Sequence, residues 1–194
     1  MDEVNNMNII VVGCGNVGKK IVEMLCHEKQ HNITVVDTRS AAINALVNQF
    51  DVMGVVGNGA SVDTLTDAGI KDADILITVT ASDEINLLTC LIARKSGNCQ
   101  TIARVRNPDY SGELMYLREK LGISVIINPE LEAAKEIGYP VMIRSAYALG
   151  GLGSGVCRDE AAFREIAESA FTFAPQVLVE ESLKGWKEIE FEVI

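Results

Sequence analysis

The chain has 194 residues, 48% of them hydrophobic, which is enough for one domain with a buried core and part of a second. Its net charge of −10 and its lack of basic blocks exclude a general nucleic-acid binder, since such affinity comes from clustered Lys and Arg. The five cysteines form no C-x-x-C pair, so the sequence predicts neither a disulfide framework nor a metal site. With no leader and no run of about 18 apolar residues, we expect a soluble cytosolic chain.

The first predicted unit is a strand, a glycine turn and a helix. An apolar run at 9–12 predicts a buried strand, and apolar residues at helical spacing from Val17 onward predict an amphipathic helix. The sequence between them, residues 13–18, reads GCGNVG and has the G-x-G-x-x-G spacing of dinucleotide-binding turns. A second strand, at 33–36, ends on Asp37, which is the acidic residue that this pattern expects about 20 positions further on.

Each part of this turn has a physical role. Gly13 permits the tight turn, Gly15 lets the backbone approach a pyrophosphate, and Gly18 lets the helix pack closely on the strand. The N–H groups at the start of the helix would bind the phosphates. Asp37 would accept hydrogen bonds from a ribose diol and repel a 2′-phosphate. The sequence thus predicts a dinucleotide or adenine-nucleotide site, and the alternative is a glycine-rich turn that only packs.

Strands and helices continue to alternate along the next hundred residues. Further strands are predicted at 52–56, 75–80, 101–105 and 125–127, and helices at 40–47, 62–68, 82–97, 114–121 and from 129 onward. Each strand is apolar along its length, which is typical of parallel strands covered on both faces. The predicted fold class is therefore α/β, a doubly wound parallel sheet of the Rossmann type.

In such sheets, ligands bind beyond the carboxyl ends of the strands, at the point where the strand order reverses. The residues that follow strand ends, and that we expect to line one crevice, are Asp37, Thr38, Asn58, Gly59, Thr80, Ala81, Ser82 and Arg104. No His, Tyr-x-x-x-Lys pair or Cys with an adjacent base is placed for hydride or acyl transfer. We therefore expect binding without turnover, and a dehydrogenase is the weaker alternative.

Residues 7–137 resemble the N-terminal nucleotide-binding domain of the TrkA family, also called RCK or KTN domains. The segments that carry the resemblance are IIVVGCGNVGKKIVEML, NITVVDTRS, NGAS, TASDEIN and ARVRNP. Members are cytosolic regulatory subunits of Trk and Ktr potassium transport systems. The resemblance implies binding of NAD(H) or ATP/ADP, a homodimer or higher homo-oligomer, and a potassium translocator partner at the inner face of the cell membrane. Its implied ligand contacts are Gly13, Gly15, Asn16, Val17, Gly18, Asp37, Asn58, Ala60, Thr80 and Arg104.

Residues 138–194 resemble a different family, the ATP-grasp module of the carbamoyl-phosphate synthetase large subunit. The segments GYPVMIRSAYALGGLGSG and LVEESLKGWKEIEFEV carry this resemblance. The pattern predicts strands at 141–144 and 176–180, a glycine loop at 150–155, a helix at 160–167 and an alternating, half-solvated strand at 186–193. The implied fold is a partial α+β fragment. Its implied nucleotide contacts are Arg144, Gly150, Gly151, Glu181, Leu183 and Glu188.

We therefore expect two domains, at 1–137 and 138–194. The second lobe of an ATP-grasp enzyme holds the magnesium ions for phosphoryl transfer, and the chain ends before it, so we expect no synthetase activity. Two alternatives remain open at this point. One is an ATP-binding fragment of a carbamoyl-phosphate synthetase-like ligase, and the other is a chimeric or truncated chain that binds nucleotides without turnover.

Overall fold

The computed structural model describes residues 6–28, 31–107, 110, 114–145, 153–174 and 176–185. The chain forms two compact units, Met1–Asn128 and Pro129–Ile194. The first unit ends before helix α6 (Pro129–Ile137), and the domain boundary expected after residue 137 stays a prediction.

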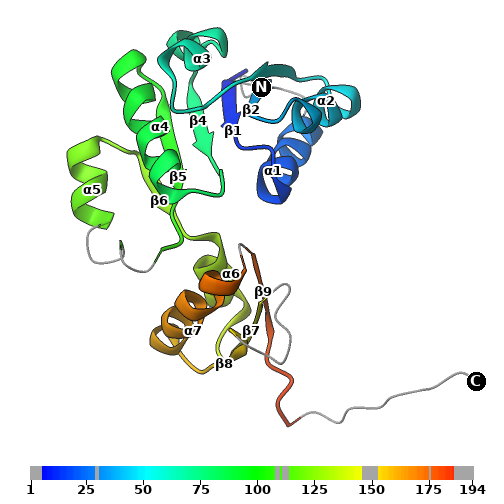
Figure 1. The fold of residues 1–194 in the computed structure, drawn as a ribbon, viewed down its shortest axis with the longest axis vertical. Coiled ribbons are helices and arrows are strands. Elements are labelled where there is room, and N and C mark those ends of the chain that lie inside the picture. The colour runs from blue at the N-terminus through cyan, green and yellow to red at the C-terminus, as the bar shows by residue number, and fades with distance from the viewer. Residues whose placement is uncertain are drawn as a thin grey trace, which may run out of the picture. The chain divides into compact units, whose positions relative to one another are not determined.

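The first unit is a parallel sheet of six strands in the order β3-β2-β1-β4-β5-β6 (Figure 1). Its elements are β1 (Asn8–Val12), α1 (Asn16–His27), β2 (Asn32–Asp37), α2 (Ser40–Gln49), β3 (Met53–Val56), α3 (Val62–Asp67), the 3₁₀ turn η1 (Ile70–Asp72), β4 (Ile75–Thr78), α4 (Asp83–Ser96), β5 (Gln100–Arg104), α5 (Leu114–Leu121) and β6 (Val125–Ile127). This is the strand order of the dinucleotide-binding fold, and the order reverses between β1 and β4. The predicted fold class is confirmed.

The two faces of this sheet have separate hydrophobic cores. In β1, Ile9 and Val11 pack with residues of α1 and α2, whereas Ile10 and Val12 pack with residues of α3 and α4. The alternation follows from the two-residue period of a strand, which sends successive side chains to opposite faces. Both faces of β1 are therefore covered, as its continuous apolar run predicts, and the loops at its carboxyl end lie between the two helical layers (Figure 1).

The second unit is a small antiparallel sheet with two helices. It contains α6, β7 (Val141–Ser145), β8 (Gly155–Cys157), α7 (Glu160–Phe173) and β9 (Val177–Glu181), with the strands in the order β8-β7-β9. Phe163 and Ala167 of α7 pack with Leu131 of α6 on the buried side chains of β7. Asp159 begins α7 as an N-cap, because its Oδ1 accepts a hydrogen bond from the backbone N–H of Ala162 at 2.8 Å.

The structure differs from the sequence prediction at several elements. Strand β4 ends at Thr78, two positions before the predicted end at Thr80, and the 3₁₀ turn η1 was not predicted. The sequence also predicts no strand at β8: Gly155 belongs to the predicted glycine loop, but it pairs with Ile143 of β7. The strand predicted at 186–193 lies outside the described residues. None of the described helices is long and apolar enough to cross a membrane.

Candidate functional site

The glycine turn holds β1 and α1 in close contact. Gly13 has a φ of 101°, its N–H donates to the carbonyl of Val36 at 2.8 Å, and a Cβ added to it would lie 2.8 Å from the backbone nitrogen of Thr80. A Cβ on Gly18 would collide with the carbonyl oxygen of Gly13. Both glycines are therefore required by the packing of the turn against α1 and the end of β4.

Gly15 differs from Gly13 and Gly18, because no atom beyond Gly15 itself and its two chain neighbours lies within 4 Å of where its Cβ would be. It is the N-cap of α1, which has no capping side chain and no acidic residue in its first turn. Helix N-termini of this kind bind phosphates through their backbone N–H groups and the helix dipole. Asn16 and Val17 open the helix at this end. The turn thus leaves open space in front of the uncapped N-terminus of α1.

Asp37 lies buried at the end of β2, and its carboxylate is held from two sides. Its Oδ2 accepts from the N–H of Cys14 at 2.8 Å and from Nη2 of Arg39 at 3.1 Å. Its Oδ1 accepts from the backbone N–H of Arg39 at 2.9 Å and from its Nε at 3.0 Å. Burial alone would raise the pKa of Asp37, but these hydrogen bonds outweigh it and hold the pKa below its usual value.

Cys14, inside the turn, is placed as an inert thiol. Burial, and next the charge of Asp37, raise its pKa to about 12, so the thiol stays protonated at neutral pH.

The turn after β3 packs beside the same strand ends. The Oδ1 of Asn58 accepts from the N–H of Ala60 at 3.0 Å and closes the turn. Gly59 is buried, and a Cβ on it would collide with Cγ1 of Val12 at the end of β1. The carbonyl of Asp37 accepts from the N–H of Gly57 at 3.0 Å, which joins this turn to β2.

A buried asparagine of α4 joins the ends of β4 and β5. The Oδ1 of Asn86 accepts from the backbone N–H of Thr80 at 2.9 Å and from its hydroxyl at 2.8 Å. The Nδ2 of Asn86 donates to the carbonyl of Arg104 at 2.9 Å. Asn86 is the last residue of the TASDEIN segment, and no role is predicted for it from the sequence. A polar residue in the apolar stripe of an amphipathic helix is the signal that could have singled it out.

The structure therefore places the predicted residues at the carboxyl ends of neighbouring strands. Gly13 to Gly18 follow β1, Asp37 and Thr38 lie at the end of β2, Asn58 to Ala60 follow β3, Thr80 and Ala81 follow β4, and Arg104 ends β5. Direct contacts join these loops to one another, from Gly13 against Thr80 to Asn86 between Thr80 and Arg104. One residue that the sequence analysis did not single out, Arg39, binds the carboxylate that was predicted to bind ribose.

The second unit has a pocket of about 480 Å³. Its lining residues are Met142, Arg144, Val156, Glu180, Glu181, Ser182, Leu183 and Lys184. Arg144, Glu181 and Leu183 were predicted as nucleotide contacts, and here they line one pocket. Nε of Arg144 lies 2.8 Å from Oε2 of Glu180. The other predicted contacts, Gly150, Gly151 and Glu188, lie outside the described residues.

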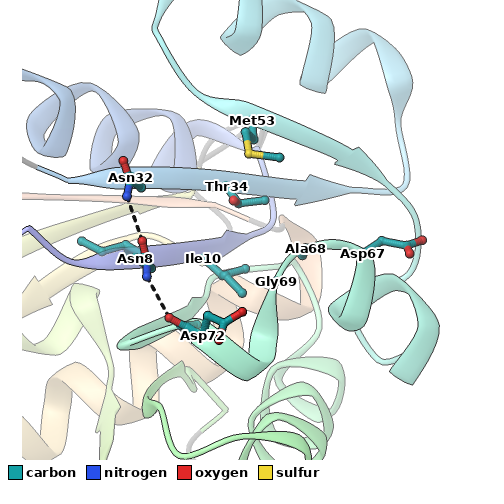
Figure 2. Close-up of a pocket in the computed structure, with 11 residues that line it drawn as sticks. Asn8, Ile10, Asn32, Thr34, Met53, Asp67, Ala68, Gly69 and Asp72 are labelled. Carbon is teal, nitrogen blue, oxygen red and sulfur yellow. Dashed lines mark hydrogen bonds between the residues drawn. The ribbon is translucent and has the colours of Figure 1, made fainter.

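A further pocket of about 290 Å³ lies at the opposite edge of the first sheet, where the strands begin (Figure 2). Figure 2 shows Asn8 at its rim, accepting from Nδ2 of Asn32 at 2.9 Å and donating to the carbonyl of Asp72 at 2.9 Å. None of the described residues predicted as ligand contacts lines this pocket. The described part of the chain contains no cluster of His, Cys, Asp and Glu suited to a metal ion.

The strand order, the glycine turn and the acid at the end of β2 define a dinucleotide-binding fold of the Rossmann type. Residues 9–129 match the TrkA-N domain, and the chain belongs to this family. Residues 121–194 match a second family, the ATP-binding domain of the carbamoyl-phosphate synthase L chain. Both resemblances found in the sequence are thereby confirmed.

The relatives also fall into two groups, one for each of the two families. The Trk system potassium uptake protein TrkA of Azorhizobium caulinodans is 35% identical over 153 residues, which are 77% of this chain and 33% of that protein. The arginine-specific large chain of carbamoyl phosphate synthase of Neurospora crassa is 54% identical over 68 residues, 35% of this chain and 6% of that protein. The chain thus spans about a third of the length of its TrkA relatives.

Solved structures support the fold. The TrkA-N domain of the inner membrane protein ybaL from Escherichia coli aligns with a TM-score of 0.60 at 23% identity, covering 71% of this chain and 96% of that one. The GsuK channel bound to NAD aligns with a TM-score of 0.59 at 19% identity, covering 77% of this chain and 26% of that one. At these identities the likeness is one of fold.

Proposed function

We propose that this chain is a nucleotide-sensing regulatory part of a Trk-type potassium uptake system. The observation that carries the proposal is the glycine turn, in which packing demands Gly13 and Gly18 but leaves the space in front of Gly15 open. Family membership and the TrkA relatives support the potassium role. The proposed contacts are Gly13, Gly15, Asn16, Val17, Gly18, Asp37, Thr38, Asn58, Gly59, Ala60, Thr80, Ala81 and Arg104.

The proposed ligand is NAD(H) or ATP/ADP, each with an adenosine ribose. Its phosphates would lie at the N-terminus of α1, and its ribose hydroxyls would donate to Asp37. A GsuK structure bound to NAD and another bound to ADP share this fold, which supports both ligand classes. The ring of carboxyl-end loops would then surround the ligand between β1 and β4.

Binding itself, rather than turnover, is the proposed event. The proposed crevice contains buried amides, hydroxyls and a thiol held protonated, but among its described residues no activated nucleophile. A bound nucleotide changes a partner only if it binds two conformations unequally. We infer that the partner is a membrane potassium translocator, that the chain acts at the cytoplasmic face of the membrane through that partner, and that it works as a homodimer or higher homo-oligomer.

Calorimetry with NADH, ADP and ATP on the purified chain tests the proposal. Wild-type protein should bind at least one of them saturably, and Gly15→Val should weaken that binding at least tenfold. The added side chain enters the open space where the pyrophosphate would lie, so the variant should fold. Asp67→Asn is a matched surface control, because Asp67 is exposed at the end of α3 and lines the pocket where the strands begin, not the glycine turn. If no nucleotide binds wild type at millimolar concentration, the proposal fails.

A second candidate function is ATP binding by the second unit. The pocket that brings Arg144, Glu181 and Leu183 together favours it, with Gly150, Gly151 and Glu188 as further proposed contacts. The matching family is an ATP-binding domain. We propose binding without carbamoyl-phosphate synthesis for this unit, and a domain boundary at 137/138. ATP-dependent phosphorylation of bicarbonate or carbamate by the purified chain would overturn that part of the proposal.

A further inference from the structure

The guanidinium of Arg39 is hydrogen-bonded to the carboxylate of Asp37, which the proposed function assigns to the ribose hydroxyls. Its Nε and Nη2 bind the two different oxygens of Asp37 at 3.0 and 3.1 Å, which is the side-by-side geometry of a strong Arg–carboxylate pair. The backbone N–H groups of Arg39 and Cys14 take the remaining positions, at 2.9 and 2.8 Å. A carboxylate has about four acceptor positions, so a ribose diol can bind Asp37 only by displacing the guanidinium.

The same pair changes the charge that a ligand meets. An unpaired Asp37 would repel a 2′-phosphate, whereas the Asp37–Arg39 pair carries no net charge. The Arg39 side chain is 63% exposed, so the guanidinium N–H groups that do not bind Asp37 face solvent at the edge of the crevice. A guanidinium group binds two oxygens of a phosphate through two parallel hydrogen bonds, as it binds the two oxygens of a carboxylate.

The neighbouring backbone suits an anion as well. Arg39 is the N-cap of α2, and α2 has neither a capping side chain nor an acidic residue in its first turn. Ser40, at the first position of the helix, is exposed to solvent. An Arg near the end of the second strand is the group that accommodates a 2′-phosphate in dinucleotide folds.

We propose that Arg39 sets the cofactor specificity of this site, so that the site accepts 2′-phosphorylated adenosine, as in NADP(H), as well as the free ribose diol of NAD(H). With NAD(H), the diol displaces the guanidinium from Asp37. With NADP(H), Asp37 stays paired and Arg39 turns its exposed N–H groups to the 2′-phosphate. The inference rests on the proposed nucleotide site and names which ligands that site distinguishes.

Titrations of NADH and NADPH against the full chain test this assignment, with wild type and Arg39→Met compared. We expect the two dissociation constants of wild type to lie within about tenfold of each other. Arg39→Met should weaken NADPH at least tenfold and leave NADH unchanged or tighter, because the competitor for Asp37 is gone. Arg118→Met removes an exposed arginine from α5 and should leave both constants unchanged.

The outcomes separate the two proposals. If wild type binds NADH but binds NADPH more than about tenfold more weakly, the assignment of Arg39 is wrong and the nucleotide site stands. An unchanged ratio of the two constants in Arg39→Met also overturns it. If neither dinucleotide nor ADP or ATP binds wild type, the proposed function and this inference fail together. A thermal melt of each variant shows whether a loss of binding comes from unfolding.

Discussion

Among single residues, Asp37 connects the largest share of the candidate site. Its carboxylate holds the N–H of Cys14 in the turn after β1, and its carbonyl accepts from Gly57 in the turn after β3. Asp37 is also the last residue of β2. The ends of β1, β2 and β3 thus meet at one residue, and replacing Asp37 would change stability as well as ligand binding.

The lowered pKa of Asp37 predicts an acid-sensitive part of the stability. A carboxyl group whose pKa is lower in the folded state contributes stability above its unfolded pKa, and this contribution is lost as pH falls through the folded pKa. We expect Asp37→Asn to lower the free energy of unfolding by about 1–2 kcal/mol at pH 7, at the lower end of the scale of charged hydrogen bonds because the Arg39 partner is exposed to solvent. The gap to wild type should begin to narrow as pH falls through the ordinary carboxyl pKa of about 4, and close as pH passes the lower pKa of folded Asp37, as urea titrations at each pH would show.

Asp67→Asn is the control for this measurement, because Asp67 is exposed at the end of α3 and is not among the groups that hold the Asp37 carboxylate. It should follow the wild-type curve at every pH. A difference between Asp37→Asn and wild type that stays constant from pH 7 to pH 3 would contradict the prediction, since it would show that the charge of Asp37 contributes nothing.

The role of Asp37 in holding the turn, and its pairing with Arg39, show where prediction from the sequence stops. The glycine spacing and the acid at the strand end locate the candidate site, because they reflect backbone geometry that only certain residues allow. The pairing of Asp37 with Arg39 depends on how the chain turns between β2 and α2, and no periodicity records that turn. The only signal of this pairing in the sequence is a charged residue within a few positions of the acid that ends the motif.

At the scale of elements, α4 joins the ends of β4 and β5. It begins with Ser82 as N-cap, whose hydroxyl accepts from the N–H of Ile85 at 3.2 Å, as the sequence predicts for a helix opening there. Asp83 accepts from the backbone N–H groups of Arg106 and Asn107 at 2.8 and 2.7 Å, beyond the end of β5. Together with Asn86, these bonds make α4 the element that connects the crevice loops to the rest of the sheet.

Asn86→Ala tests this connection. The substitution leaves the N–H of Thr80 and the carbonyl of Arg104 without their side-chain partner at a position that is fully buried. We expect a loss of about 2–3 kcal/mol in the free energy of unfolding, because unsatisfied buried polar groups keep their full desolvation cost. Urea unfolding followed by circular dichroism measures it.

Asn48→Ala, on the exposed face of α2, is the matched control and should change stability by less than about 0.5 kcal/mol. Equal stability of Asn86→Ala and Asn48→Ala would show that α4 is held by its apolar contacts alone. In that case the hydrogen bonds of Asn86 would not be what fixes the loops after β4 and β5.

The elements that were predicted and those that were not differ in the strength of their pattern. The strands of the first unit are apolar on both faces and are separated by amphipathic helices, which leaves little ambiguity. Strand β8 is three residues long, starts with Gly155, and exists because it pairs with β7. Such a strand is stabilised by its partner, so its own sequence carries no periodic signal.

The whole molecule combines two units that match different families. The first has two cores, one on each face of its sheet, and the second has a core of its own around Phe163. The matches to the two families overlap only at 121–129, next to the boundary of the compact units at Asn128. Because each unit has its own core and its own candidate pocket or crevice, we expect them to respond to nucleotides separately.

Hydrogen exchange measured on the full chain tests this separation. NADH should slow exchange in the glycine turn at 13–18 and at 57–61, and leave 141–145 and 177–184 unchanged. ATP should slow exchange in 141–145 and 177–184, since these segments line the pocket of the second unit. At a ligand concentration of about 100 times the dissociation constant, binding stabilises the folded state by about 2.7 kcal/mol. Amides that exchange only through global unfolding should then exchange about 100-fold more slowly.

A variant of Arg144 tests whether ATP slows exchange in the second unit by binding in its pocket. It lines the pocket and pairs with Glu180 at 2.8 Å, so Arg144→Ala should remove the ATP protection of the second unit while NADH still protects the first. Arg158→Ala, an exposed arginine of the same unit, should keep both effects. If NADH protects 177–184 as strongly as 13–18, the units respond to one nucleotide together. If ATP leaves 141–145 and 177–184 unchanged, the second unit has no ATP site, and nucleotide recognition belongs to the first unit alone.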